Sequence, residues 1–236
     1  MRTYGQFCPI ARGSEILAER WTPIILRNLV LLGCRTFNEI AAGAPGLSRA
    51  LLARRLRELE RAGVLEIRAK PNGRGSHYEP TPAGRDLAGV LESIGGWAER
   101  WTELTGDHAD PDVVLWSWTQ TFLRRDLLPD RRVVVRFEYR HGGRRVRLWL
   151  LAEGGAAELC RFDPGFGDDL VVAIDDPLAF ARWHMGRVEW AAALRDGAIT
   201  VTGPRALGQA LPTWNAGPDE NARMRAEHGL PVWDLP

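Results

Sequence analysis

Residues 36–63 read TFNEIAAGAPGLSRALLARRLRELERAG, and this stretch decides the fold of the first part of the chain. Thr36 and Glu39 have the spacing of a capping box, which predicts that a short helix begins here. A glycine-rich turn at 43–46 ends it, and Ser48 then caps a second helix whose leucines repeat every three or four residues. Two capped helices joined by a tight glycine turn are typical of a helix-turn-helix.

The flanking residues extend this motif to a larger domain. Thr22-Pro23, a capping residue followed by a proline, predicts an earlier buried helix. After the motif the pattern alternates as in two short strands about a turn at 71–75, which predicts a β-hairpin. A second cap-plus-proline pair then starts a long helix over residues 81–104. Together these elements predict a winged helix-turn-helix domain over residues 1–105.

The predicted helix over residues 81–104 carries more apolar surface than a small domain can cover. Leucine, isoleucine, valine and tryptophan recur along it every three or four residues. Because a large unpaired apolar face usually marks an interface, we expect this face to pack against a second copy of the chain. The candidate interface residues on this helix are Leu87, Leu91, Ile94, Trp97 and Trp101.

The helix that follows Ser48 is basic on the side opposite its leucines. Residues 49–74 hold 8 basic and 3 acidic side chains, a surplus that could neutralise a phosphate backbone. Guanidinium groups on such a helix, and donors on a hairpin tip, suit the base edges and phosphates of double-stranded DNA, although an ordinary solvated arginine face has the same pattern. The candidate DNA contacts are Ser48, Arg49, Ala50, Ala53, Arg54 and Arg57 on the helix, and Lys70, Asn72, Arg74 and His77 on the hairpin.

Residues 106–111, GDHADP, are the predicted linker to a second domain over residues 111–236. Residues 112–127 can form a helix, and residues 133–150 alternate apolar and charged side chains about a Gly-Gly turn, as in an antiparallel hairpin. Further strands and helices follow, so the predicted class is α+β with an antiparallel-rich sheet. The first 105 residues carry a net charge of +4 and the remainder −3, so the basic surplus belongs to the first domain.

Several function classes lack support in the sequence. Three widely spaced cysteines and five scattered histidines have neither disulfide nor metal-ligand spacing, so we predict no metal and no other cofactor. Neither a phosphate-binding GxxxxGK loop nor a GxSxG elbow occurs, which disfavours an enzyme. The chain has no long apolar stretch and no secretory signal, so we expect a cytoplasmic protein with no membrane partner.

Three ordered stretches carry a family resemblance: CPIARGSEILAERWTPIILRNL, RTFNEIAAGAPGLSRALLARRLRELERAGVLEIR and YEPTPAGRDLAGVLESIGGW. Through them residues 8–104 resemble the HxlR family of winged-helix regulators. The resemblance implies a homodimer built from the first helix and the long last helix, with Ser48 to Ala62 as the recognition helix. It also implies that Trp21 packs in the core and the dimer interface. Cys8 matches the position where several members carry a redox-sensing cysteine.

The second half shows a weaker resemblance, which rests on its overall pattern and on the stretch DGAITVTGPRALGQAL at 196–211. Residues 113–214 look similar to the sterol-carrier-protein fold, which implies a five-stranded sheet and helices around an apolar tunnel. Seven of the ten tryptophans lie after Gly106. A well-filled core explains any one of them, but as a set they suit a pocket for an apolar or aromatic ligand, and Trp118 and Trp149 are the candidate pocket residues.

Three hypotheses follow from these patterns. The first is a dimeric transcriptional regulator that reads a pseudo-palindromic operator, with a second domain that binds a small apolar effector. The second keeps the DNA binding but makes Cys8 the sensor, since a thiolate near Arg12 could react with oxidants or electrophiles. The third, of another class, is a carrier of hydrophobic ligands whose winged domain only mediates dimerisation.

Overall fold

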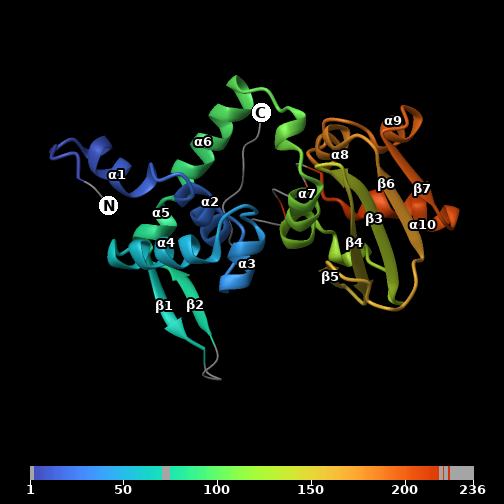
Figure 1. Ribbon diagram of the computed structural model, residues 1–236, viewed down its shortest axis with the longest axis horizontal. Helices are drawn as coiled ribbons and strands as arrows, with labels where there is room; N and C mark the ends of the chain where they lie inside the picture. The colour runs from blue at the N-terminus through green and yellow to red at the C-terminus, as the bar shows by residue number, and fades with distance from the viewer. Residues whose placement is uncertain (1–2, 71–74, 218–219, 221–222, 224–236) are drawn as a thin grey trace. The chain divides into compact units, whose positions relative to one another are not determined.

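The computed structural model describes residues 3–70, 75–217, 220 and 223, and these divide into two compact units (Figure 1). The first unit contains the described residues up to Thr102, and the second contains those from Glu103 onward. None of the described helices is long and apolar enough to cross a membrane. Each unit has its own sheet and is considered separately below.

The first unit is a set of short helices with one two-stranded sheet, in the order expected of a winged helix-turn-helix. Its elements are α1 (Pro9–Leu17), α2 (Thr22–Leu26), the π-helical turn η1 (Arg27–Leu31), α3 (Phe37–Ala42), α4 (Arg49–Arg61), β1 (Leu65–Ala69), β2 (Ser76–Pro80), α5 (Pro82–Asp86) and α6 (Ala88–Trp101).

Local hydrogen bonds start both helices of the helix-turn-helix. The backbone N–H of Glu39 donates to Thr36 Oγ1 at 3.4 Å, and the backbone N–H of Thr36 donates to Glu39 Oε2 at 3.0 Å, so the predicted capping box at α3 is confirmed. Ser48 accepts from the backbone N–H of Leu51 at 3.3 Å and caps α4. The turn between the helices includes Gly46, whose φ of 83° is a left-handed conformation that favours glycine.

A buried polar tie fixes α3 against η1. Asn28 is fully buried; its Nδ2 donates to the carbonyl of Ile40 at 2.9 Å, and its Oδ1 accepts from both Nε and a terminal nitrogen of Arg27. Arg27 also donates to the carbonyl of Gly43 at 2.7 Å, and burial lowers the pKa of this guanidinium. Because every one of these groups would cost free energy if left unpaired away from water, the tie holds the two elements at one spacing.

The wing hairpin is anchored to the helix that follows it. Strands β1 and β2 pair antiparallel, with Leu65 opposite Pro80 at the base. At that base Gly84 of α5 lies so close to β1 that an added Cβ would come within 2.1 Å of the carbonyl oxygen of Val64. Any side chain at position 84 would therefore push α5 away from the hairpin.

The long helix predicted over residues 81–104 differs in detail from the structure. It consists of α5 and α6, which meet at Leu87, and α6 ends at Trp101. The apolar repeat continues across the break, because Leu87 still has helical dihedral angles and only the hydrogen-bond pattern changes there. The predicted start is confirmed, because Thr81 caps α5 and Pro82 is its first residue, whereas the break at Leu87 and the end at Trp101 were not predicted.

The second unit is built around a five-stranded sheet, and its class is α+β. Its elements are the 3₁₀ turn η2 (Gly106–His108), α7 (Pro111–Ser117), the π-helical turn η3 (Trp118–Phe122), the 3₁₀ turn η4 (Arg125–Leu127), β3 (Val133–His141), β4 (Arg144–Glu153), β5 (Ala156–Cys160), β6 (Leu170–Ile174), α8 (Pro177–His184), α9 (Trp190–Arg195), β7 (Ile199–Thr202), α10 (Arg205–Ala210) and the 3₁₀ turn η5 (Leu211–Trp214).

The strands lie in the order β5-β4-β3-β6-β7, and only the β3–β6 pair is parallel. Two-residue Gly-Gly turns join β3 to β4 and β4 to β5, and all four glycines have positive φ, as the tightest hairpin connections require. The expected antiparallel-rich sheet is therefore present. The single helix expected over residues 112–127 is broken instead into α7, η3 and η4.

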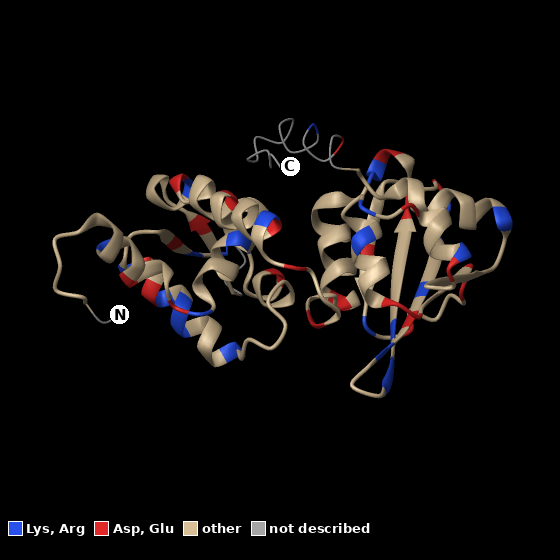
Figure 2. Ribbon diagram, turned by 90° about the horizontal axis from the view of Figure 1, so that it is seen from above, with Lys and Arg blue, Asp and Glu red and all other residues tan. Residues whose placement is uncertain are grey.

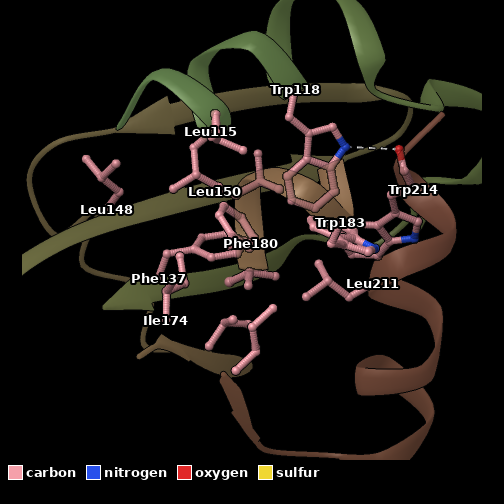
Figure 3. Close-up of a cluster of buried hydrophobic side chains, with 14 of the residues drawn as sticks. Leu115, Trp118, Phe137, Leu148, Leu150, Ile174, Phe180, Trp183, Leu211 and Trp214 are labelled. Carbon is pink, nitrogen blue, oxygen red and sulfur yellow. Dashed lines mark hydrogen bonds between the residues drawn. The ribbon is translucent and has the colours of Figure 1, made fainter. Parts of the chain in front are cut away.

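The core of the second unit is rich in aromatic rings (Figure 3). Trp118, from η3, is fully buried, and its Nε1 donates to the carbonyl of Trp214 at 3.2 Å. Its ring meets Phe137 of β3 and Trp183 of α8 edge to face, with centroids 6.1 and 5.4 Å apart. Residues that alternate along the strands thus pack with those of α7, α8 and α9 on one face of the sheet.

Candidate nucleic-acid interface

Helix α4 separates its apolar and basic residues onto opposite sides. Leu52, Leu56 and Leu59 are buried in the first unit. Among the predicted contact residues, Ser48, Arg49, Ala50, Arg54 and Arg57 are exposed and Ala53 is half-buried. The structure therefore brings the helical candidates together on one accessible surface, which we call the α4 basic face.

The first arginine of this face is held in place by α3. A terminal nitrogen of Arg49 donates to Asn38 Oδ1 at 3.0 Å, and its guanidinium lies 4.6 Å from the centre of the Phe37 ring. A cation over an aromatic face, with one further hydrogen bond, loses less side-chain entropy when it binds a ligand. The sequence did not indicate this support, because Phe37 and Asn38 belong to the preceding helix.

The other two arginines of the α4 basic face, Arg54 and Arg57, have fewer contacts within the protein than Arg49. The side chain of Arg54 is 58% exposed, and its Nε lies 3.9 Å from Glu58, which is the outer limit of an ion pair. Arg57 is exposed as well. A pair this exposed contributes little to stability, so Arg54 can exchange its carboxylate partner for another anion at small cost.

One arginine of α4 has a structural role that sequence reasoning missed. Arg55 is half-buried, contacts Glu19 closely and donates to Glu58 Oε2 at 2.7 Å. Burial alone would raise the pKa of Glu58, but hydrogen bonding and charge from Arg55 and charge from Arg54 outweigh it, so this pKa lies below its usual value. Glu19 lies 36 residues away in sequence, which no local pattern reveals.

The wing candidates are placed only in part. The backbone N–H of Lys70 donates to the carbonyl of Gly75 at 3.1 Å and closes the hairpin, and Lys70 and His77 are half-buried. His77 pairs with Arg68 across the hairpin and also forms a bridge to Thr36. Asn72 and Arg74 lie outside the described residues.

The predicted dimer residues divide into two groups. Ile94, Trp97 and Trp101 of α6 are 50%, 56% and 73% exposed, whereas Leu91 is buried within the unit and Leu87 is half-buried. Trp21 is also half-buried, against the turn at Gly46. Near the N-terminus, Phe7 and Ile10 are exposed too. The first unit therefore leaves a large set of apolar side chains uncovered.

The three cysteines have different surroundings. Cys8 stands at the N-cap position of α1 and is half-exposed. Cys34 is buried, and burial raises the pKa of its thiol to about 12. Burial also raises the pKa of Cys160. Among the described residues, no group of three or more His, Cys, Asp or Glu side chains could hold a metal ion.

The two tryptophans predicted for a ligand pocket are not brought together. Trp118 packs on the helix-covered face of the sheet against Phe137, whereas Trp149 points to the other face, where its Nε1 donates to Asp168 Oδ1 at 3.1 Å. Strand alternation explains the separation, because Leu148 and Leu150 on either side of Trp149 point into the core. A pocket lined by both residues would have to cross the sheet.

Comparison with known proteins concerns mainly the first unit. The model of the HxlR-like helix-turn-helix family matches residues 16–105. The uncharacterized HTH-type transcriptional regulator YvaP of Bacillus subtilis is 36% identical over 100 residues, which cover 42% of this chain and 92% of the relative. The chain belongs to the HxlR-like helix-turn-helix family. As an HxlR-like protein it is a winged-helix transcriptional regulator, and the family implies DNA as its partner.

Other HxlR-like relatives match over the same unit. The HTH-type transcriptional regulator YodB of B. subtilis is 30% identical over 98 residues, which cover 41% of this chain and 87% of YodB. A solved structure of the reduced form of YodB has 30% identity, covers 42% of this chain and 97% of that chain, and gives a TM-score of 0.35. The HxlR-like assignment thus rests on sequence over the first unit.

Proposed function

We propose that this HxlR-like regulator binds a pseudo-palindromic DNA operator as a homodimer, with the α4 basic face of each copy in a major groove. The observation that carries the proposal is the accessible set of Arg49, Arg54 and Arg57 along one side of α4, with Arg49 at the capped N-terminal end. Arginine is the residue that most often reads guanine edges, and the N-terminal residues of such a helix make base contacts. Ser48 and Ala50 flank these arginines.

The uncovered residues of α6 support the homodimer. Ile94, Trp97 and Trp101 are large apolar side chains exposed on one helix, and Phe7 and Ile10 add to them from the N-terminal segment. Aromatic residues exposed in this way are typical of an interface centre. In a two-fold dimer the two α4 helices would reach successive major grooves about 34 Å apart.

We further propose that the second domain, predicted over residues 111–236, is a sterol-carrier-like domain that binds a small apolar effector. A five-stranded sheet with helices on one face and an aromatic core supports it. A fluorescent fatty acid serves as the probe, and we expect saturable binding that shifts operator affinity. Binding without any shift would show a carrier and would overturn the effector role, because a ligand changes an equilibrium only through unequal affinity for its states.

The DNA proposal is tested by fluorescence anisotropy with a duplex from upstream of the protein's own gene and a random duplex of equal length. Arg54→Ala and Arg49→Ala should weaken operator binding by about 10-fold or more each, as expected for a lost base contact, and random binding much less. Arg205→Ala, an exposed arginine of α10, is the matched control and should leave both affinities unchanged. Salt-insensitive or negligible DNA binding would overturn the proposal in favour of the carrier hypothesis.

Cys8 is the second candidate sensor, because its thiol is half-exposed at the start of α1, where an oxidant or electrophile can reach it. Treatment with diamide should change operator affinity in the wild type and leave Cys8→Ser unaffected. Cys34→Ser is the control and should respond like the wild type, since that thiol is buried. If diamide changed the operator affinity of Cys8→Ser as much as that of the wild type, Cys8 would be eliminated as the sensor.

A further inference from the structure

The β3–β4 hairpin of the second unit carries a concentrated positive charge. Residues 140–147 hold four arginines, one histidine and no carboxylate, in a part of the chain whose net charge is negative. Figure 2 shows a hairpin with basic residues on both arms projecting from the body of this unit. We call residues 140–147 the basic hairpin. Its charge is local and is not a property of the whole unit.

The register of the strands places two arginines opposite each other. Arg140 is paired with Arg145, and His141 with Arg144, on either side of the Gly142-Gly143 turn. Like charges directly opposite in an antiparallel pair destabilise the sheet. The two-residue turn leaves the strands no freedom to separate these side chains along the backbone. The hairpin therefore favours an anion that could be shared between its strands.

One carboxylate neutralises only part of this charge. Glu138 contacts Arg136 closely and forms longer ion pairs with Arg145 at 3.8 Å and Arg147 at 3.9 Å, so a single negative charge is shared among three arginines. The side chains of Arg145 and Arg147 are 62% and 48% exposed, so they keep access to solvent. Within the described residues, Arg140 donates to the carbonyl of Gly143 at 3.3 Å, and neither Arg140 nor Arg144 has an ion pair with an acidic side chain.

The surroundings favour a polymeric anion over a small one. Arg140 and Arg145 line a surface pocket of about 250 Å³, but Glu138 and Asp175 line it as well, and these carboxylates repel a small anion held inside it. Arg140, Arg144 and Arg145 at the tip are exposed, so an anion can approach them from solvent without entering this pocket. Arginine pairs well with phosphate, often through two parallel hydrogen bonds.

We propose that the basic hairpin binds DNA phosphates, as a sequence-independent contact supplied by the second unit. The inference rests on the proposed DNA binding. When α4 binds DNA, the second unit is held near the same duplex because it is part of the same chain. Tethering of this kind raises the effective concentration of the second contact, so a weak contact adds to affinity. Phosphate contacts add affinity and register but carry no base information.

The test uses the full chain with Arg144→Gln/Arg145→Gln, and the exposed pair Arg195→Gln/Arg205→Gln on α9 and α10 as the matched control. Anisotropy is measured on the operator and random duplexes over a range of salt. We expect the hairpin variant to lose the same factor on both duplexes. The slope of log affinity against log salt should fall by about 4, because each copy of the proposed homodimer loses two arginines. The control pair should keep the wild-type affinity and slope, and thermal melting should show all three proteins folded.

Two outcomes would overturn the inference and leave the proposed function standing. In the first, the hairpin variant binds both duplexes with wild-type affinity and slope, and Arg54→Ala still loses operator preference. In the second, inorganic phosphate raises the melting temperature of the wild type but not of the hairpin variant, while DNA affinity is unchanged, which would assign a small-anion site. A wild type that binds neither duplex would instead overturn both proposals.

Discussion

The two units differ in how far their tryptophan side chains are exposed. In the first unit Trp97 and Trp101 of α6 are mostly exposed. Leu91 is the one residue of that helix that is buried. In the second unit Trp118 and Trp214 are buried and joined by a hydrogen bond. Tryptophan therefore contributes exposed apolar surface in the first unit and buried core in the second.

This difference indicates where each unit obtains its stability. The core of the second unit is closed by its own helices, so the unit should fold without a partner. The first unit has a core beneath α4 but leaves the α6 residues for another surface to cover. Four predictions test this contrast, from the largest expected effect to the smallest.

Replacing a tryptophan should cost far more in the second unit than in the first. Trp118→Ala removes a fully buried ring and should lower the free energy of unfolding by about 3–5 kcal/mol. Trp101→Ala, the matched exposed control, should change the stability of an isolated copy by less than about 0.5 kcal/mol. Urea denaturation at low protein concentration measures both, and similar losses for the two variants would refute the contrast.

A charge on the α6 surface should dissociate the proposed homodimer. Trp97→Asp places a carboxylate where an apolar interface would bury it, and an unpaired buried charge is strongly disfavoured. Sedimentation velocity should show the wild type as a dimer and this variant as a folded monomer. Phe162→Asp, at another exposed aromatic residue in the second unit, should remain dimeric. A dimeric Trp97→Asp protein would mean that α6 is not the interface.

The core of the second unit should also respond to acid. His184 is buried, with Nδ1 2.8 Å from Asn215 Oδ1, and burial lowers its pKa from 6.5 to about 4 despite that hydrogen bond. The unfolded chain therefore binds a proton that the folded chain refuses, so stability should fall as pH decreases from 6.5 towards 4 and stay level above 7. Melting temperature against pH should flatten in this window for His184→Gln; an unaltered profile would assign the acid sensitivity to other groups.

The smallest expected effect concerns the start of α3. Thr36→Ala removes the acceptor of the capping box and should cost about 1 kcal/mol. Thr36→Ser keeps a hydroxyl and should retain most of that stability. Chemical denaturation compares the two variants, and an equal loss from both would show that the methyl group of Thr36, and not its hydroxyl, stabilises the helix.

Features with a local cause could be predicted from the sequence. The capping box at Thr36, the cap at Ser48 and the Gly-Gly turns depend on residues within a few positions of one another, so their pattern was sufficient. The leucine spacing of α4 likewise predicted which side would be buried and so which arginines would be accessible. The residues of the α4 basic face could therefore be predicted from the sequence alone.

Features that depend on tertiary contact were not predicted. Arg55 repeats like its neighbours along α4, and only its contact with Glu19 gives it a structural role. Residues 112–127 have helical character throughout, but in the structure α7 changes to a π-helical turn at Trp118, whose side chain lies in the core, and the helical conformation ends at Leu123. The support of Arg49 by Phe37 likewise depends on how α3 and α4 pack.

The tie from Asn28 and Arg27 to the carbonyls of α3 has a consequence for how regulation can act. Sliding α3 relative to η1 would break the hydrogen bonds from Asn28 and Arg27 to the carbonyls of Ile40 and Gly43, the first of which is buried, so these two elements resist displacement against each other. We therefore expect the proposed effector to act on the separation between the two helix-turn-helix units of the proposed dimer, a distance that paired spin labels on the two copies can measure.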